Sequence, residues 1–329
     1  MYKKILIYGE NWTGTLPQLL YSDLKERGIE VDVFDYTDIM PGIKSRRFVQ
    51  KVMRRFFYRI YEKKINNKFL HIVKKIHPDV IIIAKGLNLS LPTLLSIKKI
   101  GIKLVNWNPD DFFNMKNSND NLISSMCVYD LIISSRPHLF DKYYDYGANK
   151  MLFIDWYYVP DLHFSQNLEK TIKYSFVGSW SKYREEFIDN IGKSFVVRGG
   201  GWEKSGVRFK ESHDVDSKIL SQREMSRLFE MSEVNLNILT PDNEDLSNLR
   251  FFEVPASGGM LLTERNSHSL EYLIDKKECL LYSSVDEIRE LLDSDFNYKA
   301  MGDSGMKRIL KGRHSFHDRV DFLLSHIEQ

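Results

Sequence analysis

The sequence is poor in cysteine and contains no long apolar run. Its two cysteines, Cys127 and Cys279, lie in different halves of the 329-residue chain and show no metal-ligand spacing. We expect both to be buried thiols in a reducing compartment. No apolar run approaches the roughly 18–20 residues that span a bilayer. The N-terminus enters a strand pattern with too short an apolar run for a signal peptide. These absences predict a cytoplasmic protein.

The sequence also lacks common ligand-binding motifs. No Gly-x-x-x-x-Gly-Lys-Ser/Thr string is present, which excludes a P-loop kinase or ATPase on motif grounds. Neither the loop 9–14 nor the triplet 199–201 completes Gly-x-Gly-x-x-Gly, which argues against a nicotinamide enzyme. The histidines are scattered without the spacing of a metal site. We therefore expect no metal ion and no cofactor.

The length and charge distribution favour two domains. A chain of 329 residues is long for one core, and its 43% apolar and 28% charged residues are ordinary for a globular protein. The net charge of +2 hides an asymmetry, because residues 1–160 carry 24 Lys and Arg against 16 Asp and Glu. The first half is therefore basic and the second half acidic, which suggests two units with different partners.

Apolar runs of strand length alternate with helical patterns in both halves. We predict first-half strands at 4–8, 31–34, 79–84, 103–107 and 131–134, with helices at 16–27 and 92–100. We predict second-half strands at 174–177, 195–198, 234–238, 260–263 and 280–282, with helices at 183–191, 222–231, 285–292 and over most of 298–327. This alternation is typical of an α/β fold with two doubly wound, Rossmann-like domains, here 1–160 and 161–329, facing a central cleft. Residues 156–163, which include Pro160, suit a stiff hinge between them.

The segment from Asn248 to Glu264 is the most informative part of the chain. Arg250 and Glu253 lie one helical turn apart, and Gly258-Gly259 then ends the segment before an apolar strand. A helix N-terminus and an arginine suit a phosphate, while a carboxylate on the same face can accept hydrogen bonds from ribose hydroxyls. The alternative is an Arg–Glu ion pair within an ordinary helix.

This string resembles the Arg-x-Phe-Glu-x-x-Ala-x-Gly-Gly signature of the CgeB-like, spore-maturation type glycosyltransferases, a branch of the GT-B superfamily. Other segments resemble that branch in the same order along nearly the whole chain: Trp107-x-x-Asp110-Asp111, Phe176-Val-Gly178-Ser179 followed by Arg184, and His314-Ser-Phe-x-x-Arg319. The resemblance implies a GT-B fold, with an acceptor-side first domain and a donor-binding second domain. It also implies a last helix that crosses back to the first domain.

The resemblance assigns the donor site to the second domain. Gly178 and Ser179 would line it, and Arg184 would reach a phosphate, although a structural ion pair is an equal alternative. Gly200 belongs to a glycine turn like that of GT-B donor domains. The remaining donor-binding candidates are Asn248, Arg250 and Glu253.

The candidate catalytic residues follow predicted strands of the first domain. Asp110 and Asp111 are candidates for the general base that takes the acceptor proton, and the alternative is that Asp110 caps the helix or turn that follows. Glu10, after the first strand, is a second candidate base or a substrate-positioning residue. Retaining GT-B enzymes often carry a glutamate eight positions before the one at Glu253. Asp245 stands there instead, so the stereochemistry stays open.

Residues 44–64 carry nine Lys and Arg and one acid, Glu62, with apolar residues at helical spacing. The pattern predicts a basic amphipathic helix that contacts an anionic membrane surface, or alternatively one that packs on the core. No nucleic-acid module accompanies it, so we expect no nucleic-acid partner.

We therefore expect a cytoplasmic, metal-independent hexosyl- or related transferase, with peripheral contact to the cytoplasmic membrane as an open alternative. It would move a sugar from a nucleotide-diphosphate donor to a hydroxyl of a glycan, glycolipid or glycoprotein in surface-polysaccharide or cell-envelope biosynthesis. The alternatives are a nucleotide-sugar epimerase on the same fold and a non-catalytic GT-B scaffold that docks through the basic helix.

Overall fold

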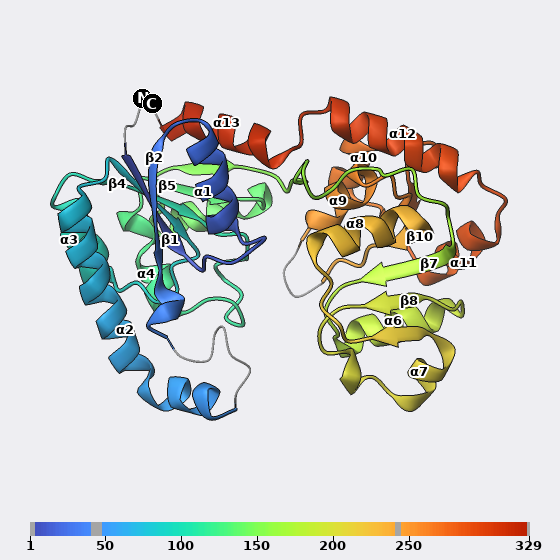
Figure 1. Cartoon of the computed structure of the whole chain (residues 1–329), viewed down its shortest axis with the longest axis horizontal. Helices are drawn as coiled ribbons and strands as arrows, with labels where there is room; N and C mark the ends of the chain where they lie inside the picture. Colours follow the sequence, from blue (N-terminus) through green and yellow to red (C-terminus); the bar gives the residue numbers. More distant parts are fainter. Residues whose placement is uncertain (1–3, 41–47, 241–244, 328–329) are drawn as a thin grey trace. The chain divides into compact units, whose positions relative to one another are not determined.

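The computed structural model describes residues 4–40, 48–240 and 245–327 (Figure 1). The chain divides into two compact units: unit 1 is Met1–Asp155 with Val320–Gln329, and unit 2 is Trp156–Arg319. Within the described residues each unit holds one parallel sheet of six strands. The prediction of an α/β fold with two Rossmann-like halves is confirmed.

The sheet of unit 1 has the strand order β2-β1-β3-β4-β5-β6. Every pairing in it is parallel, as in a sheet built from βαβ crossovers. Its strands are β1 (Lys4–Gly9), β2 (Glu30–Asp35), β3 (Val80–Ala84), β4 (Lys103–Trp107), β5 (Leu131–Ser134) and β6 (Met151–Phe153).

The inner strands β3, β4 and β5 are buried on both faces, which explains why they are mostly continuous apolar runs, whereas the edge strand β2 alternates. Leu6 and Tyr8 of β1 belong to a core shared with Phe69 of α2 and Leu94 of α3. Ile5 and Ile7 of β1 are buried too, because helix α1 covers the opposite face (Figure 1). The helices of unit 1 are α1 (Leu16–Glu26), α2 (Phe48–Ile76), α3 (Leu91–Lys98), α4 (Asp120–Ser124) and α5 (Phe140–Asp145), with short 3-10 turns at 36–38, 126–128 and 137–139.

The sheet of unit 2 has the order β12-β11-β10-β7-β8-β9, and it is parallel throughout. Its strands are β7 (Ile172–Val177), β8 (Val196–Arg198), β9 (Asp214–Asp216), β10 (Ser232–Leu236), β11 (Leu261–Glu264) and β12 (Leu280–Tyr282).

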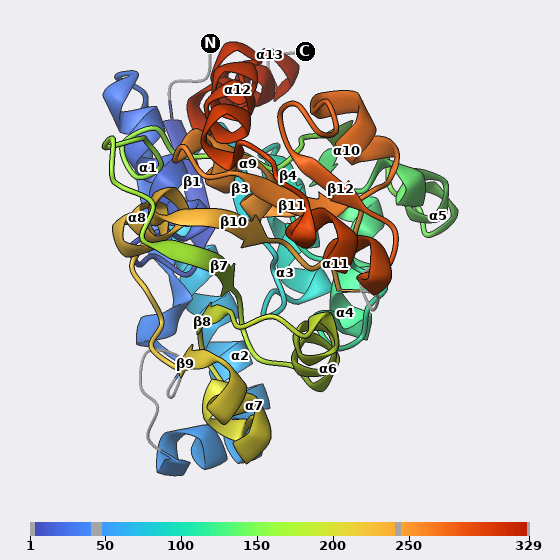
Figure 2. The same cartoon turned by 90° about the vertical axis from the view of Figure 1, so that its right-hand side faces the viewer.

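Helices cover both faces of this second sheet as well. Helices α6 and α11 contact each other and pack on one face with Phe176 (Figure 2), while α8 and α9 pack on the other face with Val177. The helices of this part are α6 (Lys182–Ile191), α7 (Val207–Ser212), α8 (Gln222–Met231), α9 (Leu249–Ala256), α10 (Ser267–Tyr272), α11 (Val285–Asp293), α12 (Tyr298–Lys311) and α13 (Phe316–Ile327), with a 3-10 turn at 202–204.

Each sheet has a point where the direction of the strand order reverses. In unit 1 it lies between β1 and β3, and in unit 2 it lies between β7 and β10. At such a point the connections leave toward opposite faces, so the loops at the carboxyl ends of the two strands diverge and leave a crevice. These two places are therefore where ligand sites are expected.

Candidate functional site

A pocket of about 260 Å³ lies at the switch point of unit 2. The ends of β7 and β10 and the first residues of α9 form it, as the topology requires. It brings together five residues predicted from the sequence: Gly178, Ser179, Arg184, Asn248 and Arg250. The other lining residues are Trp156, Phe176, Val177, Asn237, Ile238 and Leu249.

Arg184 enters this pocket from the first turn of α6. Its guanidinium donates hydrogen bonds to the carbonyl of Ser179 (2.9 Å) and to the hydroxyl of Thr240 (3.2 Å). Its Nε is buried without a hydrogen-bond partner, and no ion pair joins Arg184 to an acid of the described chain. Burial, followed by the nearby charge of Arg250, lowers the pKa of Arg184. Among the described residues, Arg184 therefore does not form the structural ion pair that was weighed as an alternative. Its positive charge lies in the pocket, where a bound anion would neutralise it.

Arg250 lines the same pocket from the second position of α9. Its Nε donates to the carbonyl of Val177 (3.3 Å), and its guanidinium lies over the ring of Phe229. Its Nη1 forms an ion pair with Glu253, so the intrahelical pair weighed as an alternative is present. Arg250 therefore faces the pocket and a buried acid at once.

Glu253 lies behind Arg250 rather than among the lining residues. Its side chain is only 2% exposed, and its second neighbour is His163, whose Nε2 lies 3.6 Å from Oε1. The predicted contact of Glu253 with a ribose is not tested by this arrangement and stays a prediction.

Asn248 precedes α9 but does not cap it with its side chain. Its amide instead donates to Oδ1 of Asn237 (2.8 Å), and its own Oδ1 is buried without a hydrogen-bond partner. The first turn of α9 is therefore left without a side-chain cap at the edge of the pocket, where its N–H groups can meet an anion.

The glycine turn 199–201 supports the pocket from behind. Gly199 has φ +138, and a Cβ there would lie 2.2 Å from the carbonyl oxygen of Gly178. Only glycine allows this close backbone approach to a pocket-lining loop. Gly200 lies outside the residues that line the pocket, and its predicted contact with a ligand stays a prediction.

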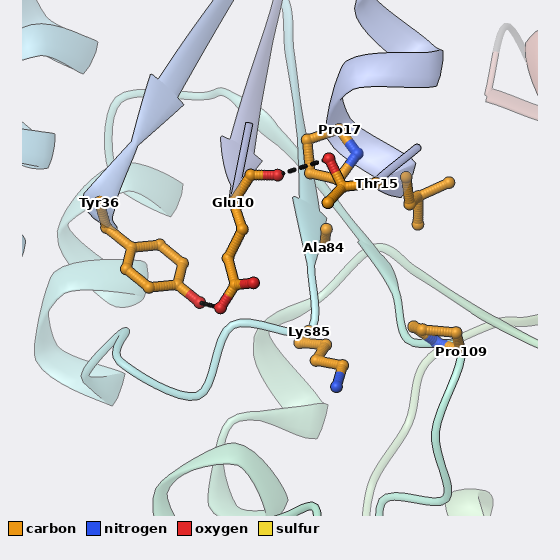
Figure 3. Close-up of a pocket in the computed structure, with 8 residues that line it drawn as sticks. Glu10, Thr15, Pro17, Tyr36, Ala84, Lys85 and Pro109 are labelled. Carbon is orange, nitrogen blue, oxygen red and sulfur yellow. Dashed lines mark hydrogen bonds between the residues drawn. The ribbon is translucent and has the colours of Figure 1, made fainter. Parts of the chain in front are cut away.

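A second pocket, of about 200 Å³, lies at the switch point of unit 1 (Figure 3). Glu10 follows β1 and Lys85 follows β3, so the two strands on either side of the reversal each supply a charged residue. The hydroxyl of Tyr36 donates to Oε1 of Glu10 (2.7 Å), and burial raises the pKa of Tyr36, which keeps that proton in place. The other lining residues are Thr15, Leu16, Pro17, Ala84 and Pro109.

The two predicted aspartates behave differently from Glu10. Asp110 forms an ion pair with Lys85. Asp111 is buried, and its Oδ1 accepts the N–H of Phe113 (2.8 Å) in a local turn, where no helix begins. Neither aspartate lines the pocket, although Pro109 does. Their role as a general base stays a prediction.

The sequence did not single out Trp156, Asn237, His163 or Tyr36 as site residues. Asn237 follows a buried strand, a signal that the switch-point rule could have used. His163 and Tyr36 reach their sites through tertiary contacts that no local pattern indicates. Among the described residues no cluster of three or more His, Cys, Asp or Glu could hold a metal ion.

Residues 181–325 match a protein family described as glycosyl transferase-like. The comparison with curated proteins gives no match. The family match covers 145 of the 329 residues, the part of the chain from α6 to α13.

Solved structures share the fold of this chain over nearly its whole length. A sucrose-phosphate synthase from Thermosynechococcus elongatus has a TM-score of 0.70 and 10% identity, and the match covers 99% of this chain and 98% of that one. An α,α-trehalose-phosphate synthase (UDP-forming) from Burkholderia vietnamiensis has a TM-score of 0.67 and 14% identity over 99% and 100%. Anabaena Alr3699/HepE, solved in complex with UDP and glucose, has a TM-score of 0.65 and 10% identity over 99% of both chains. At these identities the likeness concerns the fold alone.

Proposed function

We propose that this chain is a GT-B glycosyltransferase that moves a sugar, a hexose or a related one, from a nucleoside-diphosphate donor to a hydroxyl of a glycan, glycolipid or glycoprotein. The observation that carries the proposal is the pair of guanidinium groups, Arg184 and Arg250, in one switch-point pocket. Because Glu253 pairs with Arg250, the three charges of Arg184, Arg250 and Glu253 leave one surplus positive charge, which favours a bound anion in this partly buried site. The motifs around Arg250 support placement in the CgeB-like branch and a role in surface-polysaccharide or cell-envelope biosynthesis.

The transfer breaks the bond between the anomeric carbon of the sugar and the diphosphate oxygen. The acceptor oxygen forms a new bond to that carbon, and its proton passes to a base. The leaving diphosphate gains negative charge, which Arg184, Arg250 and the first N–H groups of α9 would stabilise without a metal ion. Glu253 would receive the ribose hydroxyls, and unit 1 would hold the acceptor.

An anionic membrane surface is a further proposed partner, through the N-terminal part of α2. Residues 44–47 of the predicted basic helix lie outside the described residues, as do the side chains at 48–52, 54 and 55. In the C-terminal part of α2, Ile65, Phe69 and Val73 pack on the core of unit 1. These core residues lie beyond residues 44–64, and within that segment Tyr58 and Tyr61 also pack against the core, so membrane contact of the basic helix stays a proposal.

That N-terminal part exposes the large apolar side chains Met53, Phe56, Phe57 and Ile60, and Phe56 is 78% exposed. The spacing is i, i+3, i+4 and i+7, which puts apolar residues on one side of a helix, although the backbone is non-helical at Phe57. Exposed cations at positions 59, 63 and 64 surround this apolar group. Exposed apolar side chains among cations fit the headgroup region of an anionic bilayer. Among the described helices none is long and apolar enough to cross a membrane.

The proposed transfer is tested by incubating the protein with a panel of radiolabelled UDP-, GDP-, dTDP- and CMP-activated sugars and following their breakdown. We expect one donor to be hydrolysed slowly, and Arg184→Gln to abolish this. Arg208→Gln is the matched control, because Arg208 is an exposed arginine of unit 2 outside the pocket. Release of an isomerised nucleotide sugar would favour the epimerase, and a panel that is neither bound nor hydrolysed would favour the scaffold.

A further inference from the structure

The pocket of unit 1 has a lining that indicates what kind of acceptor it takes. Its charged lining residues are Glu10 and Lys85, and its polar ones include the hydroxyl-bearing Thr15 and Tyr36. The rest of the lining is apolar. A small pocket with a few convergent oxygen atoms and apolar walls is suited to a hydroxylated ring.

Glu10 is the anionic group of this lining, and its orientation is fixed. Tyr36 donates to Oε1, and the backbone carbonyl of Glu10 accepts from the hydroxyl of Thr15 (2.7 Å). Figure 3 shows the carboxylate extending from the end of β1 into the open space above Lys85, with Tyr36 on one side only. The other carboxylate oxygen can accept a hydrogen bond from a ligand hydroxyl.

The positive charge of Lys85 does not offset the negative charge of Glu10. Lys85 forms an ion pair with Asp110 just outside the lining, so the positive charge at this position is already neutralised. The local balance of Glu10, Lys85 and Asp110 is one net negative charge. A phosphate that entered the pocket would meet a like charge without a surplus cation.

The N-terminus of α1, beside the pocket, does not provide a phosphate-binding site either. Pro17 occupies its first turn and lines the pocket with its ring, and proline has no N–H to donate. The N–H of Gly14, just before the helix, donates to the side chain of Gln18 (3.2 Å). The N-terminus of α1 is thus a weak phosphate cradle, in contrast to the uncapped start of α9 in unit 2.

We infer that the pocket of unit 1 binds an uncharged polyhydroxyl group, a sugar ring without a phosphate, and that Glu10 accepts a hydrogen bond from one of its hydroxyls. This inference deepens the proposed function and rests on it for the identity of the pocket as the acceptor side. It separates this chain from the structural neighbours whose names include a phosphorylated sugar. Glu10, rather than Asp110 or Asp111, is then the carboxylate placed to receive the acceptor proton.

The test measures ligand binding without any donor, so that it does not depend on transfer. Methyl glucoside, methyl galactoside and methyl mannoside are each compared with their 6-phosphate esters by saturation-transfer NMR, with and without UDP. We expect at least one uncharged glycoside to bind at least about 10-fold more tightly than its phosphate ester, because like charges oppose each other in the pocket.

The variant Glu10→Gln keeps the shape of the side chain and removes its charge. We expect it to weaken binding of the uncharged glycoside by about 10-fold and to reduce the discrimination against the phosphate ester. Glu26→Gln, an exposed glutamate of α1, is the matched control and should change neither value.

Three results would overturn the inference: tighter binding of the phosphate esters, unchanged glycoside binding in Glu10→Gln, or binding of neither set. Failure of the proposed function would look different. In that case no nucleoside diphosphate would bind and no sugar would be transferred, while the preference of unit 1 for uncharged glycosides would persist.

Discussion

His163 and Glu253 lie with Nε2 and Oε1 3.6 Å apart inside unit 2. The N–H of Val159 donates to Nδ1 of His163 (3.0 Å), so a neutral His163 carries its proton on Nε2. That proton faces both Glu253 and Oε1 of Gln222, which lies 3.2 Å away. Glu253 is thus held between Arg250 on its own helix and an N–H of His163, which reaches it from the segment that begins unit 2.

This arrangement predicts different effects of two substitutions at His163. His163→Gln can present an N–H near the position of Nε2, whereas His163→Asn can accept only from Val159. We expect the Asn variant to weaken nucleoside-diphosphate binding by about 1–2 kcal/mol and the Gln variant by less, because only the latter keeps a donor toward Glu253. Calorimetric titration checks this once circular dichroism shows that both variants fold. Equal losses in both would mean that His163 only packs the segment.

The same histidine predicts a pH dependence of stability. Burial lowers the pKa of His163 below 6.5, an effect that Glu253 opposes and Arg250 reinforces. The unfolded chain therefore binds a proton first as the pH falls through about 6.5, and the folded state loses stability below that pH. His213 is lowered in the same direction by burial, with Asp189 opposing. We expect His163→Asn to reduce, but not abolish, the decrease in unfolding free energy between pH 7 and pH 5, measured by urea titration. An unchanged slope would contradict the buried, neutral histidine.

The backbone geometry at Gly199 predicts that a substitution there strongly lowers the stability of the fold, and Gly192 provides a matched control. At φ +138 an added Cβ would meet the backbone of Gly178, whereas Gly192, at φ +71, has nothing within 4 Å of an added Cβ. We expect Gly199→Ala to lower the free energy of unfolding by about 2–6 kcal/mol, from backbone strain and overpacking together. Gly192→Ala should cost about 1–2 kcal/mol from backbone strain alone. Chemical denaturation of both variants checks the difference, and similar losses would show that the approach to Gly178 is not tight.

The exposed apolar group on α2 predicts binding to anionic lipid. Phe56→Ser with Ile60→Ser should lower co-sedimentation with vesicles containing 30% phosphatidylglycerol at least about 10-fold, because two apolar side chains no longer enter the headgroup region. Val207→Ser, at an exposed apolar position of unit 2, is the control. Binding of the unmodified protein should fall with added salt and be weak on phosphatidylcholine. Equal sedimentation of all three proteins would end the membrane proposal.

Much of the fold could be predicted because its inner strands are buried on both faces. Runs such as Val80–Ala84 carry no polar interruption, and the helices between them end in recognisable turns. The three-residue edge strands β6 and β9 were not predicted, because such short segments carry too little periodicity to be read from sequence.

The candidate site was predictable only where a residue is close in sequence to a strand end or helix start. Gly178, Ser179, Arg184, Asn248 and Arg250 share one pocket because β7, α6 and α9 all begin or end there. The ion pair of Asp110 with Lys85 depends on two loops that are distant in sequence, so spacing could not reveal it. The sequence therefore predicted which loops matter but not which side chains neutralise one another.

The most direct test of the account is calorimetric titration of the purified protein with UDP, GDP, dTDP and CMP. Wild type and Arg208→Gln should bind one of them with equal affinity. Arg184→Gln should weaken that binding by about 2–4 kcal/mol. The variant lacks the guanidinium that would bind the phosphates and that has no acidic partner among the described residues. Absence of binding by every nucleotide, or unchanged affinity in Arg184→Gln, would contradict a nucleotide site at the switch point of unit 2.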